Sequence, residues 1–162
     1  MAEKRTTVPG WTDGLPYVLY RANQAVHRLV LEAIDGMGVT ITQLGLAVHL
    51  DELGHLSASD LARRFHITPQ SVSTALGRLE SLGWVRRFPH PVHRKVIWYE
   101  VTEKGLEGVA EGRQRLAELH ERLSDVLGAA VAREAIADLQ RIVELIDGPD
   151  PDPGPLWPVD VR

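Results

Sequence analysis

The 162-residue sequence contains no cysteine and no long hydrophobic run. The absence of cysteine excludes disulfide bonds, thiol catalysis, thiol redox sensing and cysteine-ligated zinc. No apolar run approaches the roughly 18 residues that a membrane-spanning helix needs. The charged start, Met1–Arg5, is not followed by the apolar segment of a secretory signal. We therefore expect a cytoplasmic protein with one main domain.

The sequence also lacks the patterns on which enzyme active sites are commonly built. Paired carboxylates at a fixed spacing, a phosphate-binding glycine loop and a serine nucleophile elbow are all missing. Gly105, Gly108 and Gly112 lie on one face of a predicted helix, where they suit close helix packing or bending. We predict no enzymatic activity and no cofactor.

Basic residues are concentrated in one part of an acidic chain. The net charge is −4, from 18 basic and 22 acidic residues. Residues 63–95, however, hold seven basic residues against a single acidic one, Glu80. Such a segment is typical of a surface that binds a polyanion, although charge alone equally fits a solvated face.

Caps, prolines and glycines divide the chain into helices. Apolar residues at helical spacing predict a helix over 16–35, which opens with a proline. Thr40 and Ser57 are each followed three residues later by a residue that completes a capping box. They predict helices from 40 to just before Gly54 and from 57 to about 65.

In the second half of the chain, capping residues, prolines and glycines again mark the ends of predicted helices. Thr68 and a following proline predict a helix to Leu82, with a glycine as its stop. Thr102 is predicted to cap a long helix to about residue 127, and a last helix covers about 130–146. Residues 148–162 hold five prolines and two glycines, which predict a poorly ordered or surface-draped tail.

Between these helices the pattern changes to that of strands. Residues 84–88 and 95–101 are rich in aromatic and β-branched side chains. The intervening segment, 89–93, contains two prolines, so we predict a loop between two strands. The first helix and the last two helices carry broad apolar faces, and a dimer assembled from both termini is the simplest way to cover them.

Residues 61–76 predict two short helices around a tight turn. On the second helix, Val72, Leu76 and Leu79 recur at a spacing that directs them into the core. Short polar side chains then face outward near the helix N-terminus, where a DNA major groove can accept them. The alternative is a plain helical hairpin with a polar surface.

These residues resemble a known family. The stretch from Ser57 to Gly105 is similar to the winged helix-turn-helix of the MarR family of bacterial transcriptional regulators, through the strings LSASDLARRF, ITPQSVS, RLESLGWVRR and VTEKG. With the flanking helices, the resemblance covers about 15–147. It implies a homodimer with interlocked terminal helices, whose recognition helices enter successive major grooves of a palindromic operator.

The resemblance also implies the fold. We expect a mainly α protein with a small two- to three-stranded β wing, in which a winged helix-turn-helix is flanked by N- and C-terminal dimerisation helices. Residues 1–39 and 103–147 would form the dimerisation helices. Residues 40–102 would form the DNA-binding lobe, and 148–162 the proline-rich C-terminal tail.

Carried over residue by residue, the resemblance implies two groups of DNA contacts. Arg94 matches the wing arginine that reaches into the minor groove, and the flanking basic residues contact the DNA backbone. The recognition-helix group consists of Pro69, Gln70, Ser71, Ser73, Thr74 and Arg78. The wing group consists of Arg86, Arg87, His90, His93, Arg94 and Lys95.

His90 and His93 depart from the family, which commonly has aspartates in the wing loop that brace its arginine. A protonated imidazole at either position would attract DNA phosphates. The alternative is that both are exposed loop side chains that never approach the duplex. They could also form half a metal site, but without cysteine or an obvious carboxylate nearby we predict no metal.

A stripe of aromatic and polar residues lies on the first helix, beside its apolar face. The resemblance implies a ligand crevice between the dimerisation helices and the DNA-binding lobe, often for aromatic acids or phenols. The stripe suits such a pocket, and it equally suits a polar dimer seam. Its members are Tyr17, Tyr20, Asn23, Gln24 and His27.

Two functions follow from these patterns. The first is a homodimeric, sequence-specific DNA-binding regulator, a repressor relieved by a small molecule. The second is a helical interaction module that binds a protein partner through the same basic face. Affinity for duplex DNA distinguishes them, because each phosphate contact releases counterions and makes binding fall steeply with salt.

Overall fold

The computed structural model describes residues 10–148, which form a mainly helical fold around a small sheet. The lobe that begins at residue 41 contains α2 (Ile41–Leu53), β1 (Leu56–Ser57), α3 (Ala58–Phe65), α4 (Pro69–Ser81), β2 (Val85–Pro89) and β3 (Ile97–Val101). It is flanked by α1 (Leu15–Ala33), α5 (Glu103–Leu127) and α6 (Ala129–Asp147). Apart from residue 148, the predicted tail lies outside the described residues.

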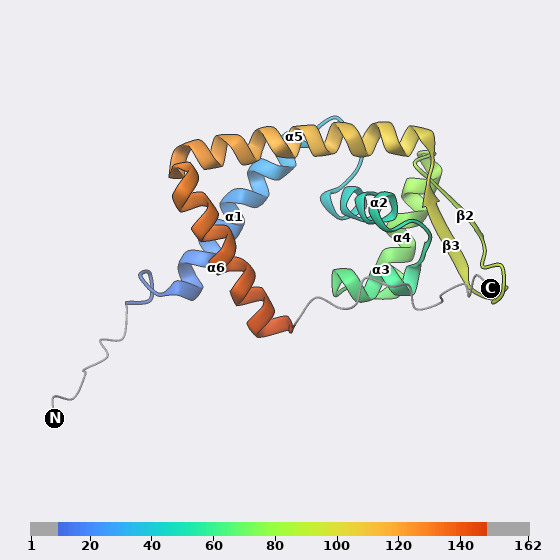
Figure 1. The fold of residues 1–162 in the computed structure, drawn as a ribbon, viewed down its shortest axis with the longest axis horizontal. Helices are drawn as coiled ribbons and strands as arrows, with labels where there is room; N and C mark the ends of the chain where they lie inside the picture. Colours follow the sequence, from blue (N-terminus) through green and yellow to red (C-terminus); the bar gives the residue numbers. More distant parts are fainter. Residues whose placement is uncertain (1–9, 149–162) are drawn as a thin grey trace, which may run out of the picture.

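The long helix α5 organises the molecule (Figure 1). Its N-terminal half lies over the lobe, whereas α1 and α6 lie at its C-terminal half. The lobe and the terminal helices are therefore held at opposite ends of one helix. Among residues 10–148, no helix has the length and hydrophobicity needed to cross a membrane.

The predicted helix starts are confirmed. Both predicted capping boxes form, with the N–H of Gln43 donating to Thr40 Oγ1 at 3.2 Å and that of Asp60 to Ser57 Oγ at 3.2 Å. Thr68 caps α4, and Thr102 caps α5 by accepting the N–H of Gly105 at 3.1 Å. These caps satisfy backbone donors that the first helical turn leaves without partners.

The sheet has three antiparallel strands in the order β1-β3-β2. The register of the β2–β3 hairpin runs from Val85 opposite Val101 to Pro89 opposite Ile97. The sequence prediction placed Pro89 in the loop, and that assignment was wrong. An end position of an edge strand tolerates proline, because no ladder hydrogen bond has to be donated there.

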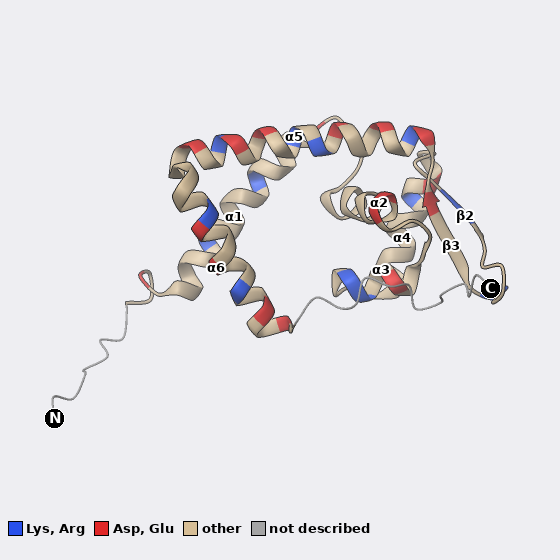
Figure 2. Ribbon diagram, in the orientation of Figure 1, with Lys and Arg blue, Asp and Glu red and all other residues tan. Residues whose placement is uncertain are grey.

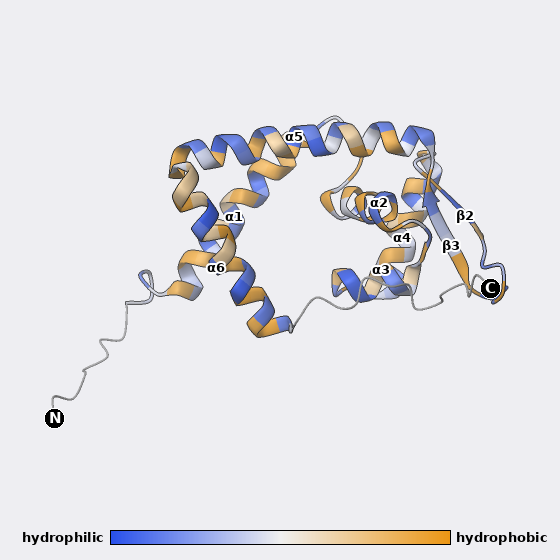
Figure 3. Ribbon diagram, in the orientation of Figure 1, coloured by the Kyte–Doolittle hydropathy of each residue, from blue (hydrophilic) through white to orange (hydrophobic). Residues whose placement is uncertain are grey.

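The core lies between the lobe helices and α5, and the terminal helices add little to it. No residue of α1 is buried, and only Ala132 is buried on α6. Both helices instead expose large apolar side chains. Hydrophobic residues recur along both ribbons in Figure 3. The fully buried side chains come mainly from the lobe and include Leu44, Leu46, Leu56, Leu61, Val72, Leu76, Leu79 and, from α5, Val109.

Candidate nucleic-acid interface

The helix α4 is fixed in rotation by its apolar residues. Val72, Leu76 and Leu79 are completely buried against α2, α3 and the rest of the core, as their spacing predicted. The opposite side of the helix faces solvent. All six residues predicted for the recognition helix are exposed there, namely Pro69, Gln70, Ser71, Ser73, Thr74 and Arg78.

The turn before α4 is shaped by local backbone geometry. His66 ends α3 in the left-handed conformation, with φ of 51°, and the N–H of Ile67 returns to the carbonyl of Ala62 at 3.2 Å. Thr68 then caps α4, and its Oγ1 lies 2.9 Å from the hydroxyl of Ser71. This arrangement presents the N-terminus of α4, with its partial positive charge, at the surface.

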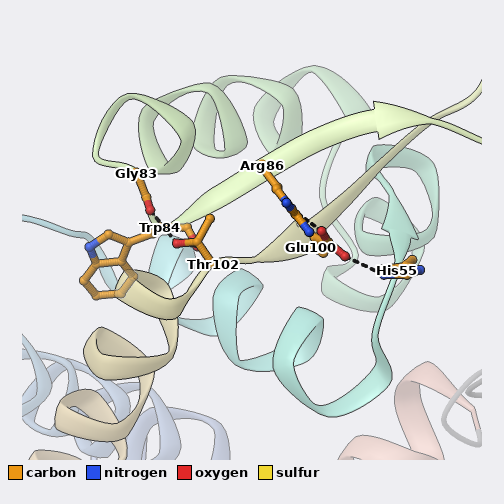
Figure 4. Close-up of polar contacts among 6 residues, drawn as sticks. All are labelled: His55, Gly83, Trp84, Arg86, Glu100 and Thr102. Atoms are coloured by element: carbon orange, nitrogen blue, oxygen red, sulfur yellow. Dashed lines mark hydrogen bonds and ion pairs between the residues drawn. The ribbon is translucent and has the colours of Figure 1, made fainter.

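The other end of α4 is joined to α5 through Trp84 (Figure 4). Gly83 has φ of 76°, and the N–H of Trp84 donates to the carbonyl of Leu79 at 2.9 Å, which is a Schellman ending. The hydroxyl of Thr102 donates to the carbonyl of Gly83 at 2.5 Å, and Lys104 Nζ to that of Leu82 at 2.7 Å. Helix α4 is thus held against the start of α5.

Glycines on α5 allow this helix to pack closely against the lobe. A Cβ added at Gly105 would lie 2.6 Å from Val101 Cγ1, and one at Gly108 would lie 2.8 Å from Trp84 Cε2. At Gly112 it would lie 2.6 Å from Leu44 Cδ1. All three distances are too short for a real side chain, so these glycines serve helix packing, one of the two uses predicted for them.

On the wing, two arginines are each held by a carboxylate. Arg86 lies opposite Glu100 in the β2–β3 register, and its Nε donates to that carboxylate (Figure 4). Arg87 Nε lies 3.2 Å from Glu80 Oε1, on α4. The two arginine side chains remain 73% and 62% exposed, so their outer guanidinium nitrogens are available to phosphates. Within the lobe, α3, α4 and β2 all carry basic residues, whereas α5 carries both signs (Figure 2).

Glu100 also binds His55, which the sequence analysis left without a role. His55 Nε2 lies 2.6 Å from Glu100 Oε2, and the His55 ring packs edge-on to Phe88 at 5.0 Å between centroids. Burial acts to raise the pKa of Glu100, but the hydrogen bonds and charges of Arg86 and His55 outweigh it and lower the pKa below its usual value. The hairpin register was the signal that could have paired Glu100 with Arg86 from sequence.

His90 does not occupy the exposed position that we predicted. It is completely buried, and its ring packs against Trp98 with 4.2 Å between centroids. Its Nδ1 accepts the backbone N–H groups of Val92 and His93, at 3.1 and 3.0 Å. His90 therefore closes the turn from inside, as a carboxylate could, and its buried ring is not presented to solvent as a DNA contact would need.

The remaining wing residues lie where a contact could form. His93, Arg94 and Lys95 are exposed in the loop between β2 and β3. The loop is closed by hydrogen bonds from His90 N to Val96 O at 2.9 Å and from Val96 N to His93 O at 2.7 Å. The three side chains therefore project from a defined turn at the tip of the hairpin.

The aromatic and polar stripe of α1 divides into two parts. Tyr17 and Tyr20 line a cavity of about 710 Å³, with Trp11 and the residues that start α1. Asn23, Gln24 and His27 are exposed and do not line it.

The cavity lined by Tyr17 and Tyr20 is at the start of α1, whereas the predicted crevice lies between the terminal helices and the lobe. A separate cavity of about 690 Å³ lies where the end of α1 meets the lobe, with Ile34, Gln43 and Arg78 in its wall, and none of the five stripe residues lines it. In the protomer, α1 runs away from the lobe, so residues 17–27 lie more than one helical turn from the end of α1 that meets the lobe. Within residues 10–148, no group of three or more acidic or histidine side chains is arranged to hold a metal ion.

Comparison with known proteins finds similarity to transcriptional regulators. The model of the MarR family matches residues 37–95. An HTH-type transcriptional regulator of Mycobacterium leprae, ML2140, is 32% identical over 117 residues, which cover 67% of this chain and 76% of the relative. The repressor MdtR of Bacillus subtilis is 30% identical over 96 residues. That match covers 57% of this chain and 62% of MdtR, less than two thirds of its length.

Solved structures share the fold. A mutant MarR from E. coli, crystallised with operator DNA, superposes with a TM-score of 0.74 and covers 84% of this chain and 99% of MarR at 20% identity. BpsR of Bordetella bronchiseptica, whose DNA binding is regulated by 6-hydroxynicotinic acid, gives a TM-score of 0.75 over 85% of this chain and 97% of BpsR, also at 20% identity.

Proposed function

Because the chain belongs to the MarR family of transcriptional regulators, and is not an enzyme, we propose that it is a homodimeric repressor of a palindromic operator. The observation that carries this proposal is the outward face of α4, which is polar, exposed and anchored from behind by three buried apolar residues. A helix of this kind places short side chains against base edges in the major groove.

The DNA contacts divide by chemistry. On α4, Gln70, Ser71, Ser73 and Thr74 read base edges, with Pro69 and Arg78 at the margins of the same face. On the wing, Arg94 enters the minor groove, and His93 and Lys95 lie beside it. Arg86 and Arg87 contact phosphates, which position the protein without carrying sequence information.

The dimer forms through the terminal helices. Leu139 and Val143 on α6, and Leu15 and Val18 on α1, are among the large apolar side chains that lie about half exposed in one protomer. Contiguous apolar surface of this kind marks an interface. A second copy that covers it would also bring two α4 helices to one duplex, with half-sites about one helical turn apart.

A small aromatic molecule releases the operator. The relative BpsR is regulated by 6-hydroxynicotinic acid, an aromatic acid. In this chain, the cavity walled by Trp11, Tyr17 and Tyr20 offers rings against which an aromatic acid or phenol can stack. The polar residues Asn23, Gln24 and His27 fit the dimer seam better than this cavity.

The test is footprinting of the DNA upstream of the protein's own reading frame. Specific binding should weaken steeply with salt. Arg87→Ala should weaken binding to all sequences alike, whereas a bulkier residue at Thr74 should change the preferred bases. Arg141→Ala, which removes an exposed charge from α6, serves as the matched control and should leave DNA affinity unchanged. Equal, weak affinity for random and upstream DNA would exclude the repressor.

A further inference from the structure

A glycine lies in the middle of the outward face of α4. Gly77 is exposed, and it follows Gln70 by seven residues, Ser73 by four and Thr74 by three. Residues at these spacings lie on the same face of a helix. Gly77 is therefore surrounded by the side chains that we propose to read DNA.

Nothing inside the described structure requires a glycine at this position. Gly77 is not among the residues with positive φ, and a Cβ added to it would meet no atom within 4 Å. The other glycines inside helices of residues 10–148 differ, because a Cβ at Gly45, Gly105, Gly108 or Gly112 would crowd a neighbouring side chain or backbone. Glycine weakens a helix relative to alanine, so α4 loses stability here without an internal benefit.

Two side chains near Gly77 fold back onto α4 and do not project from it. The hydroxyl of Thr74 donates to the carbonyl of Gln70 at 3.0 Å, and that of Ser81 to the carbonyl of Arg78 at 2.7 Å. Both side chains are thus turned back onto their own helix. The backbone of α4 at Gly77 is exposed and carries no side chain of its own, and close approach of another molecule needs such a position.

We infer that Gly77 is the point of closest approach between α4 and the DNA, where the missing Cβ sets how deeply the helix enters the major groove. This inference rests on the proposed DNA-binding function and adds a residue that limits insertion depth. A side chain at this position would meet the base edges or the sugar-phosphate wall first. The helix would then withdraw or tilt, and Ser73 and Thr74 would lose their contacts together.

The experiment compares Gly77→Ala and Gly77→Leu with wild type, using the tightest-binding duplex selected from a random pool. Gly77→Ala should raise Tm by about 2–4 °C, because alanine favours the helix. It should also lower affinity about tenfold, which corresponds to ~1.4 kcal/mol, and Gly77→Leu should lower it further. Ala110→Leu, a similar enlargement at an exposed position of α5, should leave affinity unchanged.

The outcomes separate this inference from the function on which it rests. If wild type prefers no duplex over random DNA, the repressor and the role of Gly77 both fail. If wild type binds specifically and both Gly77 variants bind equally well, only the role of Gly77 is overturned. Loss of affinity together with a lower Tm also overturns it, because the glycine would then serve the fold.

Discussion

Replacing Gly108 by alanine tests whether α5 is held tightly against the recognition helix. The added Cβ would lie 2.8 Å from Trp84 Cε2 and nearer still to two other atoms of the indole. Trp84 is only 7% exposed, and its backbone is held by Thr102, so the ring has little room to withdraw. The variant must therefore displace either the indole or α5.

The size of the effect follows from two opposing contributions. Overpacking a well-packed core costs ~1–3 kcal/mol, and this contact lies at the upper end because several ring atoms are too close. Alanine returns roughly 1 kcal/mol through its better helix propensity. A net loss of about 2 kcal/mol should lower Tm by roughly 4–8 °C in a protein of this length.

Thermal unfolding followed by circular dichroism measures this change, with Gly77→Ala as the matched reference. The same exchange at Gly77 meets open space, so it should raise Tm while Gly108→Ala lowers it. Adding Trp84→Phe to Gly108→Ala should recover part of the loss, because a smaller ring leaves room for the methyl group. A Gly108→Ala protein as stable as wild type would refute the close packing.

Three further predictions concern Glu100, Leu139 and His90. The pKa of Glu100 is lowered in the folded state, so its stabilisation is present above the usual carboxyl range and is lost as the pH falls through the folded pKa. Urea unfolding should therefore show the advantage of wild type over Glu100→Gln shrinking with acidification, and a constant difference would contradict this. Leu139→Asp should leave the protomer folded, because the side chain is 46% exposed, yet abolish the dimer and DNA binding; a dimer in sedimentation would contradict it. His90→Asp should keep the wing turn and His90→Ala should open it, as measured by amide exchange at Val92 and His93.

Local features of the fold were predictable from sequence because their causes lie within a few residues. A capping box needs two side chains three positions apart, and the boxes at Thr40 and Ser57 formed as predicted. The rotation of α4 followed from the period of Val72, Leu76 and Leu79 in the same way. The side chains of the recognition helix could therefore be assigned to its exposed face before any tertiary contact was known.

Features that depend on distant partners were missed. His90 is buried because the ring of Trp98, on the other strand of the hairpin, covers it. Polarity alone could not reveal this, since an imidazole suits both a surface loop and an internal turn. The strand β1 is only two residues long, and its pairing with Tyr99 and Trp98 defines it rather than any pattern of its own.

The contacts at Trp84 also limit how the DNA-binding lobe can move. Thr102 and Lys104 hydrogen-bond to the end of α4, and Gly105 brings α5 against the Trp84 carbonyl, so α4 cannot turn relative to the start of α5 without breaking them. In the middle of α5, Arg115 donates to the carbonyl of Asp35, just beyond the end of α1, at 2.8 Å. In the proposed dimer, the separation of the two recognition helices therefore changes only when α5 bends or the lobes move as rigid bodies. A ligand bound at α1 would have to act through one of these motions.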